Sequence, residues 1–175
     1  MYSVIFNITF LSISLSFVFS ANAQSTLNKH IEEVRKIIKT DATGIVRGYD
    51  FNTTVDKIKS SEDAVLIMEN DHTLMYKLDI NAKEYCDIIY QYDKTTKKLK
   101  SISLIFLEER DAKPEETLID DFQNYFTERF GNFKVNEKDD EVWTSKDGTF
   151  SIELSDETRP GDDLIEIEIE ITKIK

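Results

Sequence analysis

The last part of the chain alternates regularly between apolar and acidic residues. Seven consecutive positions follow this pattern: Ile165, Glu166, Ile167, Glu168, Ile169, Glu170 and Ile171. Successive side chains of a β-strand point to opposite sides of its sheet. The pattern therefore predicts a strand over 164–174 that presents isoleucines to the core and glutamates to the other side.

The rest of the chain carries shorter signals for both helices and strands. Apolar residues at helical spacing predict helices at about 26–40 and 53–61, and a third from Leu118 to Phe130, just before Gly131. Asn52 or Thr53 is the expected N-terminal cap of the second helix. Alternating or apolar runs predict seven further strands, at 64–69, 74–80, 85–92, 99–107, 133–136, 141–144 and 149–154. The segments between the first four of these strands are too short for crossover helices, so we expect them to be antiparallel.

The same order of elements occurs twice. Residues 51–107 and 117–174 each give one helix followed by four strands, at an offset of roughly 63–67 residues. Each half alone would bury too little apolar surface to be stable. We therefore expect a single α+β domain over 24–175. Its antiparallel sheet would have about seven or eight strands from two α-β4 repeats, with the helices packed on one face.

This order of elements resembles that of exported bacterial proteins built from tandem helix-plus-four-strand repeats, the shape of β-lactamase-inhibitor proteins. It is more distantly similar to BamE-like envelope modules. The resemblance covers about 51–174 and implies an interaction or inhibitor role. The repeats of the inhibitor family carry disulfides, whereas Cys86 is the single cysteine here, and no functional residue is carried over.

The start of the chain has the features of a secretory signal. Residues 1–20 contain no charged side chain, and the small-x-small sequence Ala21, Asn22, Ala23 follows them. The apolar part is shorter than the roughly 20 residues that span a bilayer. We expect a signal peptide at 1–23, a secreted or periplasmic location, and no membrane insertion after its removal.

The charge balance narrows the choice of partners. There are 34 Asp and Glu against 22 Lys and Arg, a net charge of −12. The electrostatic field of a protein with this negative charge repels nucleic acid and anionic membrane surfaces, so neither is expected as a partner. For the glutamates of the last strand, the simplest expectation is the water-facing row of an edge or half-exposed strand, where charge also blocks edge-to-edge aggregation. The alternatives are pairing with lysines of a neighbouring strand, or a face open to a basic partner.

Motifs for catalysis and cofactor binding are largely missing from the sequence. It contains no G-x-S-x-G, H-E-x-x-H, C-x-x-C or phosphate-binding glycine loop, so no catalytic residue and no cofactor is expected. Cys86 lies in an apolar run and is expected in the core. One acidic loop is a candidate calcium site, with Asp156, Glu157, Asp162 and Asp163 as its candidate ligands.

Four aromatic residues belong to predicted strands: Tyr76, Tyr90, Tyr92 and Trp143. They either pack in the core or, if they lie on an uncovered side of the sheet, form a binding face. The leading hypothesis is an exported, non-enzymatic binding module for an unknown protein or small ligand. A small carboxylate-dependent enzyme and a structural accessory protein of the cell envelope are the alternatives.

Overall fold

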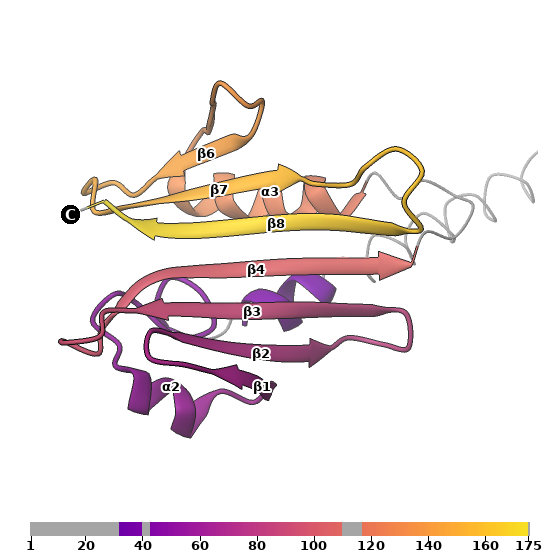
Figure 1. The fold of residues 1–175 in the computed structure, drawn as a ribbon. Helices are drawn as coiled ribbons and strands as arrows, with labels where there is room; N and C mark the ends of the chain where they lie inside the picture. Colours follow the sequence, from indigo (N-terminus) through magenta and orange to yellow (C-terminus); the bar gives the residue numbers. More distant parts are fainter. Residues whose placement is uncertain (1–31, 40–42, 110–116, 175) are drawn as a thin grey trace, which may run out of the picture.

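The computed structural model describes residues 32–39, 43–109 and 117–174, and eight strands in these ranges form one antiparallel sheet (Figure 1). The strands are β1 (Val65–Glu69), β2 (Thr73–Asp79), β3 (Glu84–Tyr92), β4 (Leu99–Glu109), β5 (Lys134–Val135), β6 (Glu141–Thr144), β7 (Phe150–Asp156) and β8 (Leu164–Lys173). Their order across the sheet is β1-β2-β3-β4-β8-β7-β6-β5. The predicted α+β class with an antiparallel sheet is confirmed.

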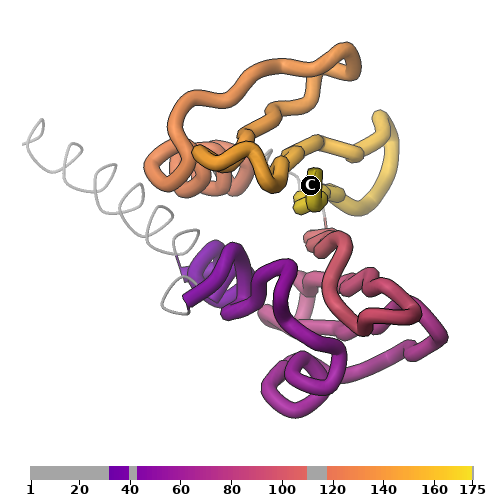
Figure 2. The backbone as a smooth tube through the Cα atoms, turned by 90° about the vertical axis from the view of Figure 1, so that its left-hand side faces the viewer, coloured from indigo at the N-terminus to yellow at the C-terminus, as the bar shows by residue number. Residues whose placement is uncertain are grey.

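Three helical segments accompany the sheet. They are α2 (Val55–Ser61), α3 (Thr117–Phe130) and a helical stretch at 32–38. In Figure 2, α3 and the 32–38 segment lie on the same side of the strands. Within the described ranges, no helix combines the length and apolar character that crossing a membrane requires. The expected signal peptide and the first part of the helix expected at 26–40 lie outside the described residues.

Helix α2 has its N-terminal cap one residue after Thr53, the later of the two predicted caps. Thr54 caps it, and its side chain accepts a hydrogen bond from the Lys57 amide at 3.4 Å. Thr53 is engaged elsewhere, because its hydroxyl accepts from the Asp50 amide at 3.0 Å and donates to the Asp50 carboxylate at 3.1 Å. The turn before the helix therefore uses one threonine and the helix uses the next.

The core lies between the helices and one side of the sheet. Every second residue of the long strands contributes to it, as the pairing Ile102↔Ile171, Leu104↔Ile169, Phe106↔Ile167 across β4 and β8 illustrates. From α3, Phe122 and Phe126 are fully buried over the second half of the sheet. The isoleucine side of the last strand thus packs as the alternation predicts, and burying such side chains stabilises the fold by about 2 kcal/mol each.

A buried ion pair joins the N-terminal segment to α2 and the sheet. Arg47 and Glu62 have fully buried side chains, and the guanidinium contacts the carboxylate at 2.5 Å. Arg47 also donates to the Ile37 carbonyl at 2.8 Å, and Tyr90 of β3 donates to Glu62 at 2.5 Å. The pKa of Glu62 falls to about 2: burial opposes the fall, and the hydrogen bond and charge of Arg47 outweigh it. This network fixes the position of the chain that leads into α2.

Candidate functional site

The aromatic side chains considered for a binding face lie in the core. Their exposed fractions are 3% for Tyr76, 0% for Tyr90, 4% for Tyr92 and 1% for Trp143. Each occupies the strand phase that faces the helices, so none of them reaches the opposite side of the sheet. The Tyr92 hydroxyl donates to a backbone carbonyl at 2.7 Å, and the Trp143 indole donates to a threonine hydroxyl at 3.3 Å. Their role here is packing.

The acidic residues considered for calcium lie in and beside the loop between β7 and β8. Asp156, Glu157, Asp162 and Asp163 are all exposed. The Asp156 carboxylate accepts a hydrogen bond from the Thr158 amide at 2.9 Å, which is a local turn contact. Across the described parts of the chain, no three or more His, Cys, Asp or Glu side chains are grouped so as to hold a metal ion.

Cys86 lies in the core with no exposed surface. Burial raises the pKa of its thiol to about 12, so the thiolate needed for nucleophilic chemistry is not populated near neutral pH.

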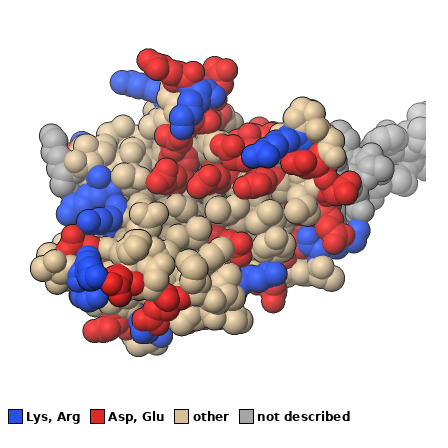
Figure 3. All heavy atoms as spheres, viewed as in Figure 1, with Lys and Arg blue, Asp and Glu red and all other residues tan. Residues whose placement is uncertain are grey.

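The side of the sheet away from the helices, called the open face below, has two distinct halves. On β3 and β4 it carries four half-buried side chains, called the apolar strip: Tyr85, Ile89, Ile105 and Leu107. The half-buried carboxylate of Asp87 interrupts the strip opposite Ile105. On β7 and β8 it carries an acidic band, which consists of Glu153, Glu166, Glu168 and Glu170. Figure 3 views this face and shows the carboxylates gathered over β7 and β8, above a largely uncharged area. The strip and the band are adjacent, because Ile105 pairs with Glu168 and Leu107 with Glu166.

The glutamates lie on the water-facing side of a half-exposed strand, as one part of the expectation had it, but the other part, that they protect a sheet edge, is wrong. Strand β8 lies between β4 and β7 in the middle of the sheet, since the fourth strands of the two halves pair with each other. Its neighbours supply no compensating lysine on the open face: Glu170 is opposite Ser103 on one side and Glu153 on the other. Like charges directly opposite each other in a sheet are destabilising. The sequence could not locate this strand, because a strand's place in a sheet depends on partners far away in the chain.

The acidic band is electrostatically strained. The pKa of Glu168 is raised, first by partial burial and then by the charges of Glu170, Glu157, Glu166 and Glu153. The pKa of Glu153 is raised by partial burial and by neighbouring carboxylates. Within the described residues the band has one ion pair, between Lys138 and Glu153 at 3.9 Å. Positive charge placed over this band would lower its energy.

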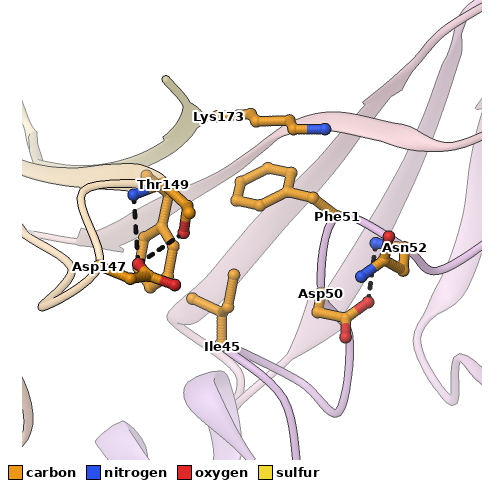
Figure 4. A pocket seen from close by; sticks show the side chains of 8 residues that line it. Ile45, Asp50, Phe51, Asn52, Asp147, Thr149 and Lys173 are labelled. Atoms are coloured by element: carbon orange, nitrogen blue, oxygen red, sulfur yellow. Dashed lines mark hydrogen bonds between the residues drawn. The ribbon is translucent and has the colours of Figure 1, made fainter. Parts of the chain in front are cut away.

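A pocket of about 380 Å³ lies at one end of the sheet on the helix side (Figure 4). One wall comes from the segment before α2, with Asp50 and Phe51. The other comes from Asp147 in the β6–β7 turn and Phe150 at the start of β7, and Lys173 comes from the end of β8. The pKa of Asp147 is lowered by hydrogen bonds from Ser145 and Thr149, so it is ionised at neutral pH. Three segments far apart in the sequence form this pocket, so no local sequence motif predicts it.

Compared with family models, with curated proteins and with solved structures, the chain matches none of them.

Proposed function

We propose that this protein is an exported, non-enzymatic binding module whose open face docks a protein with a basic surface. The observation that carries the proposal is the acidic band on a central strand, with no lysine opposite it on either neighbour. Export rests on the expected signal sequence at 1–23. The resemblance of the element order to tandem-repeat inhibitor proteins points to the same kind of role.

The composition of the open face suits a protein partner. The apolar strip offers half-buried side chains that lose the rest of their exposed surface on docking, and the acidic band next to it selects for Lys and Arg. A partner with an apolar centre and basic residues along one side would complement both halves. Complementary charge mainly raises the association rate and the specificity, so binding should weaken as salt increases.

The pKa shifts and positions of these carboxylates support a binding role for the protein rather than acid–base catalysis. A catalytic acid needs a raised pKa in a site that encloses a substrate. Four carboxylates with a raised pKa are Asp87, Glu141, Glu153 and Glu168. None of these lines the pocket, and the pKa of Asp147, which does line it, is lowered instead.

We further propose that the two halves are duplicated α-β4 units. One row of paired residues crosses six strands in the order Tyr76, Ile88, Leu104, Ile169, Leu154, Glu141. The pair Leu104 and Ile169 is the centre of this row, so a duplication would match its first three members to its last three. The strand order is symmetrical about the same centre, with β4, β3, β2 and β1 on one side and β8, β7, β6 and β5 on the other. In this register Glu141 of β6 is the counterpart of Tyr76 of β2.

The docking proposal is tested by comparing two double variants of equal charge. Glu168→Gln/Glu170→Gln alters the acidic band, whereas Glu128→Gln/Glu137→Gln removes two exposed glutamates from α3 and the β5–β6 turn. Each protein is used to capture partners from an envelope extract of its own source, and captured proteins are purified and retested by calorimetry. We expect a basic protein that binds the wild type and the control variant, and that binds the band variant at least tenfold more weakly. Equal binding by both variants, or no purified protein that binds, would contradict the proposal.

A further inference from the structure

We infer that the pocket beside Lys173 binds a small zwitterion with an apolar ring, of the kind represented by an aromatic α-amino acid. This site is separate from the open face. Phe150 and Lys173 pair across β7 and β8 in the phase of Ile152 and Ile171, which face the helices. The pocket therefore opens on the opposite side of the sheet from the acidic band.

The walls of the pocket hold their carboxylates in place before any ligand arrives. Asp50 Oδ1 accepts hydrogen bonds from the Asn52 amide at 2.8 Å and from the Thr53 hydroxyl at 3.1 Å. Asp147 Oδ1 accepts from the hydroxyls of Ser145 and Thr149, both at 2.8 Å. In each carboxylate these contacts use one oxygen, so the Oδ2 atoms remain available to an ammonium group. A site fixed in this way loses little entropy when it binds.

The remaining lining supplies a cation and an apolar floor. Lys173 is exposed, and no carboxylate of the described residues forms an ion pair with it. Figure 4 shows its side chain above Phe51, with Asp147 on one side of the pocket and Asp50 on the other. The rings of Phe51 and Phe150 lie 6.0 Å apart at 50°. An aromatic ring can rest against them while its substituents reach the polar rim.

These three features together define the ligand. The two carboxylates can bind an ammonium group, and the lysine can bind a carboxylate. The phenylalanines can pack against a ring or a branched apolar group. The volume of about 380 Å³ is at the lower end of the range for small-molecule sites, so the ligand is a single small molecule. A purely anionic molecule would meet two carboxylates, and a purely cationic one would leave Lys173 without a partner.

The test is a titration followed by amide chemical shifts in the full-length mature protein, with three probes. L-phenylalanine has both charged groups, phenethylamine lacks the carboxylate, and 3-phenylpropionate lacks the ammonium. We expect L-phenylalanine to bind best, with a Kd on the order of 1 mM for a ligand of this size. The shift changes should be confined to 45–53, 145–150 and 173. The phenylpropionate should bind most weakly.

Two lysine variants separate the role of Lys173 from a general loss of charge. Lys173→Met should weaken L-phenylalanine about fivefold and leave phenethylamine unchanged, since one partly exposed ion pair is lost. Lys134→Met on β5 removes an equal charge from an exposed position outside the pocket and should change neither. Equal affinity for the three probes, equal effects of the two variants, or no shifts at about tenfold higher concentration would overturn the inference. None of these results bears on docking at the open face.

Discussion

Replacing Glu168 by Gln should stabilise the protein, although the substitution removes a charge from a water-facing strand. Glu166 and Glu170 are its neighbours on the same strand and the same face, at about 6.7 Å. Two charges at that distance in water repel by about 0.6 kcal/mol before screening. Ordinary salt reduces each repulsion to about 0.3 kcal/mol, because the Debye length is then about 8 Å. The two neighbours together therefore give about 0.6 kcal/mol, and Glu153 adds to it.

The size of this gain depends on salt in a way that identifies its cause. With a Debye length of about 30 Å in 0.01 M salt, the stabilisation by Glu168→Gln should rise to about 1 kcal/mol. In 1 M salt it should fall to about 0.1 kcal/mol. Urea unfolding followed by the fluorescence of Trp143, the single and buried tryptophan, measures each value.

The matched control is Glu69→Gln. Glu69 is a strand glutamate too, but it forms an ion pair with Lys59 at 2.8 Å. Its replacement changes the net charge equally and should destabilise by about 0.5 kcal/mol, because an attraction is lost. If both variants shift the free energy of unfolding in the same direction, or if the gain from Glu168→Gln is the same at all salt concentrations, the electrostatic explanation is refuted.

The pH dependence supplies a second check on the same residue. The folded-state pKa of Glu168 is raised above its ordinary value of 4.5, so the folded protein binds this proton more tightly than the unfolded chain. The contribution of Glu168 to stability therefore falls as the pH rises from about 4.5 through the folded-state pKa. The advantage of Glu168→Gln should disappear below that window, where the carboxyl is neutral in both states.

Three further outcomes follow from the described contacts. Glu62→Gln should lower the free energy of unfolding by about 3–5 kcal/mol, because it leaves the buried Arg47 with one charge partner fewer. Since the pKa of Glu62 falls from 4.5 to about 2, its stabilisation is present above pH 4.5 and is lost toward pH 2, so the acid unfolding curve of this variant should be flatter. Gly44→Ala should cost about 2–4 kcal/mol in urea unfolding, because φ is +107° and the added Cβ would lie 2.8 Å from the backbone of Tyr49, whereas Gly131→Ala, with open space around its Cβ, should cost about 1 kcal/mol. The Cys86 thiol should react with a colorimetric thiol reagent only at the rate of unfolding, and a fast reaction in native buffer would contradict its burial.

Local patterns predicted most of the fold because the elements are regular. The strand expected at 141–144 is observed at Glu141–Thr144, and the one expected at 164–174 ends at Lys173. The strand expected at 99–107 continues to Glu109, because β8 pairs with it to the end: Glu109 lies opposite Leu164. That partner is distant in the sequence, so the extension has no local signal. The alternation of apolar and polar residues within a strand shows which side of the sheet each side chain faces. It does not show which other strand lies next to it in the sheet.

The candidate sites depend on this missing information. The sequence pattern predicted the acidic row of the last strand. Because β8 lies between β4 and β7, this row is an acidic surface on a central strand and does not protect a sheet edge. The aromatic residues were visible too, but which side the helices cover decides whether they are buried. The pocket was not visible at all, since Asp50, Asp147 and Lys173 come from three separate segments.

The pairing of β4 with β8 also has a consequence for the order of folding. The other strand pairs join neighbours in the chain, so each can form as soon as its hairpin closes. Strand β4 instead pairs with the last strand, and this pairing closes a loop of more than fifty residues. Because closing this long loop costs the most chain entropy, we expect it to be the slowest pairing step. Until then the long edge of β4 is unpaired and can recruit another chain. We therefore expect the yield of refolding to fall as the protein concentration rises. The loss should be larger the longer β8 takes to pair with β4.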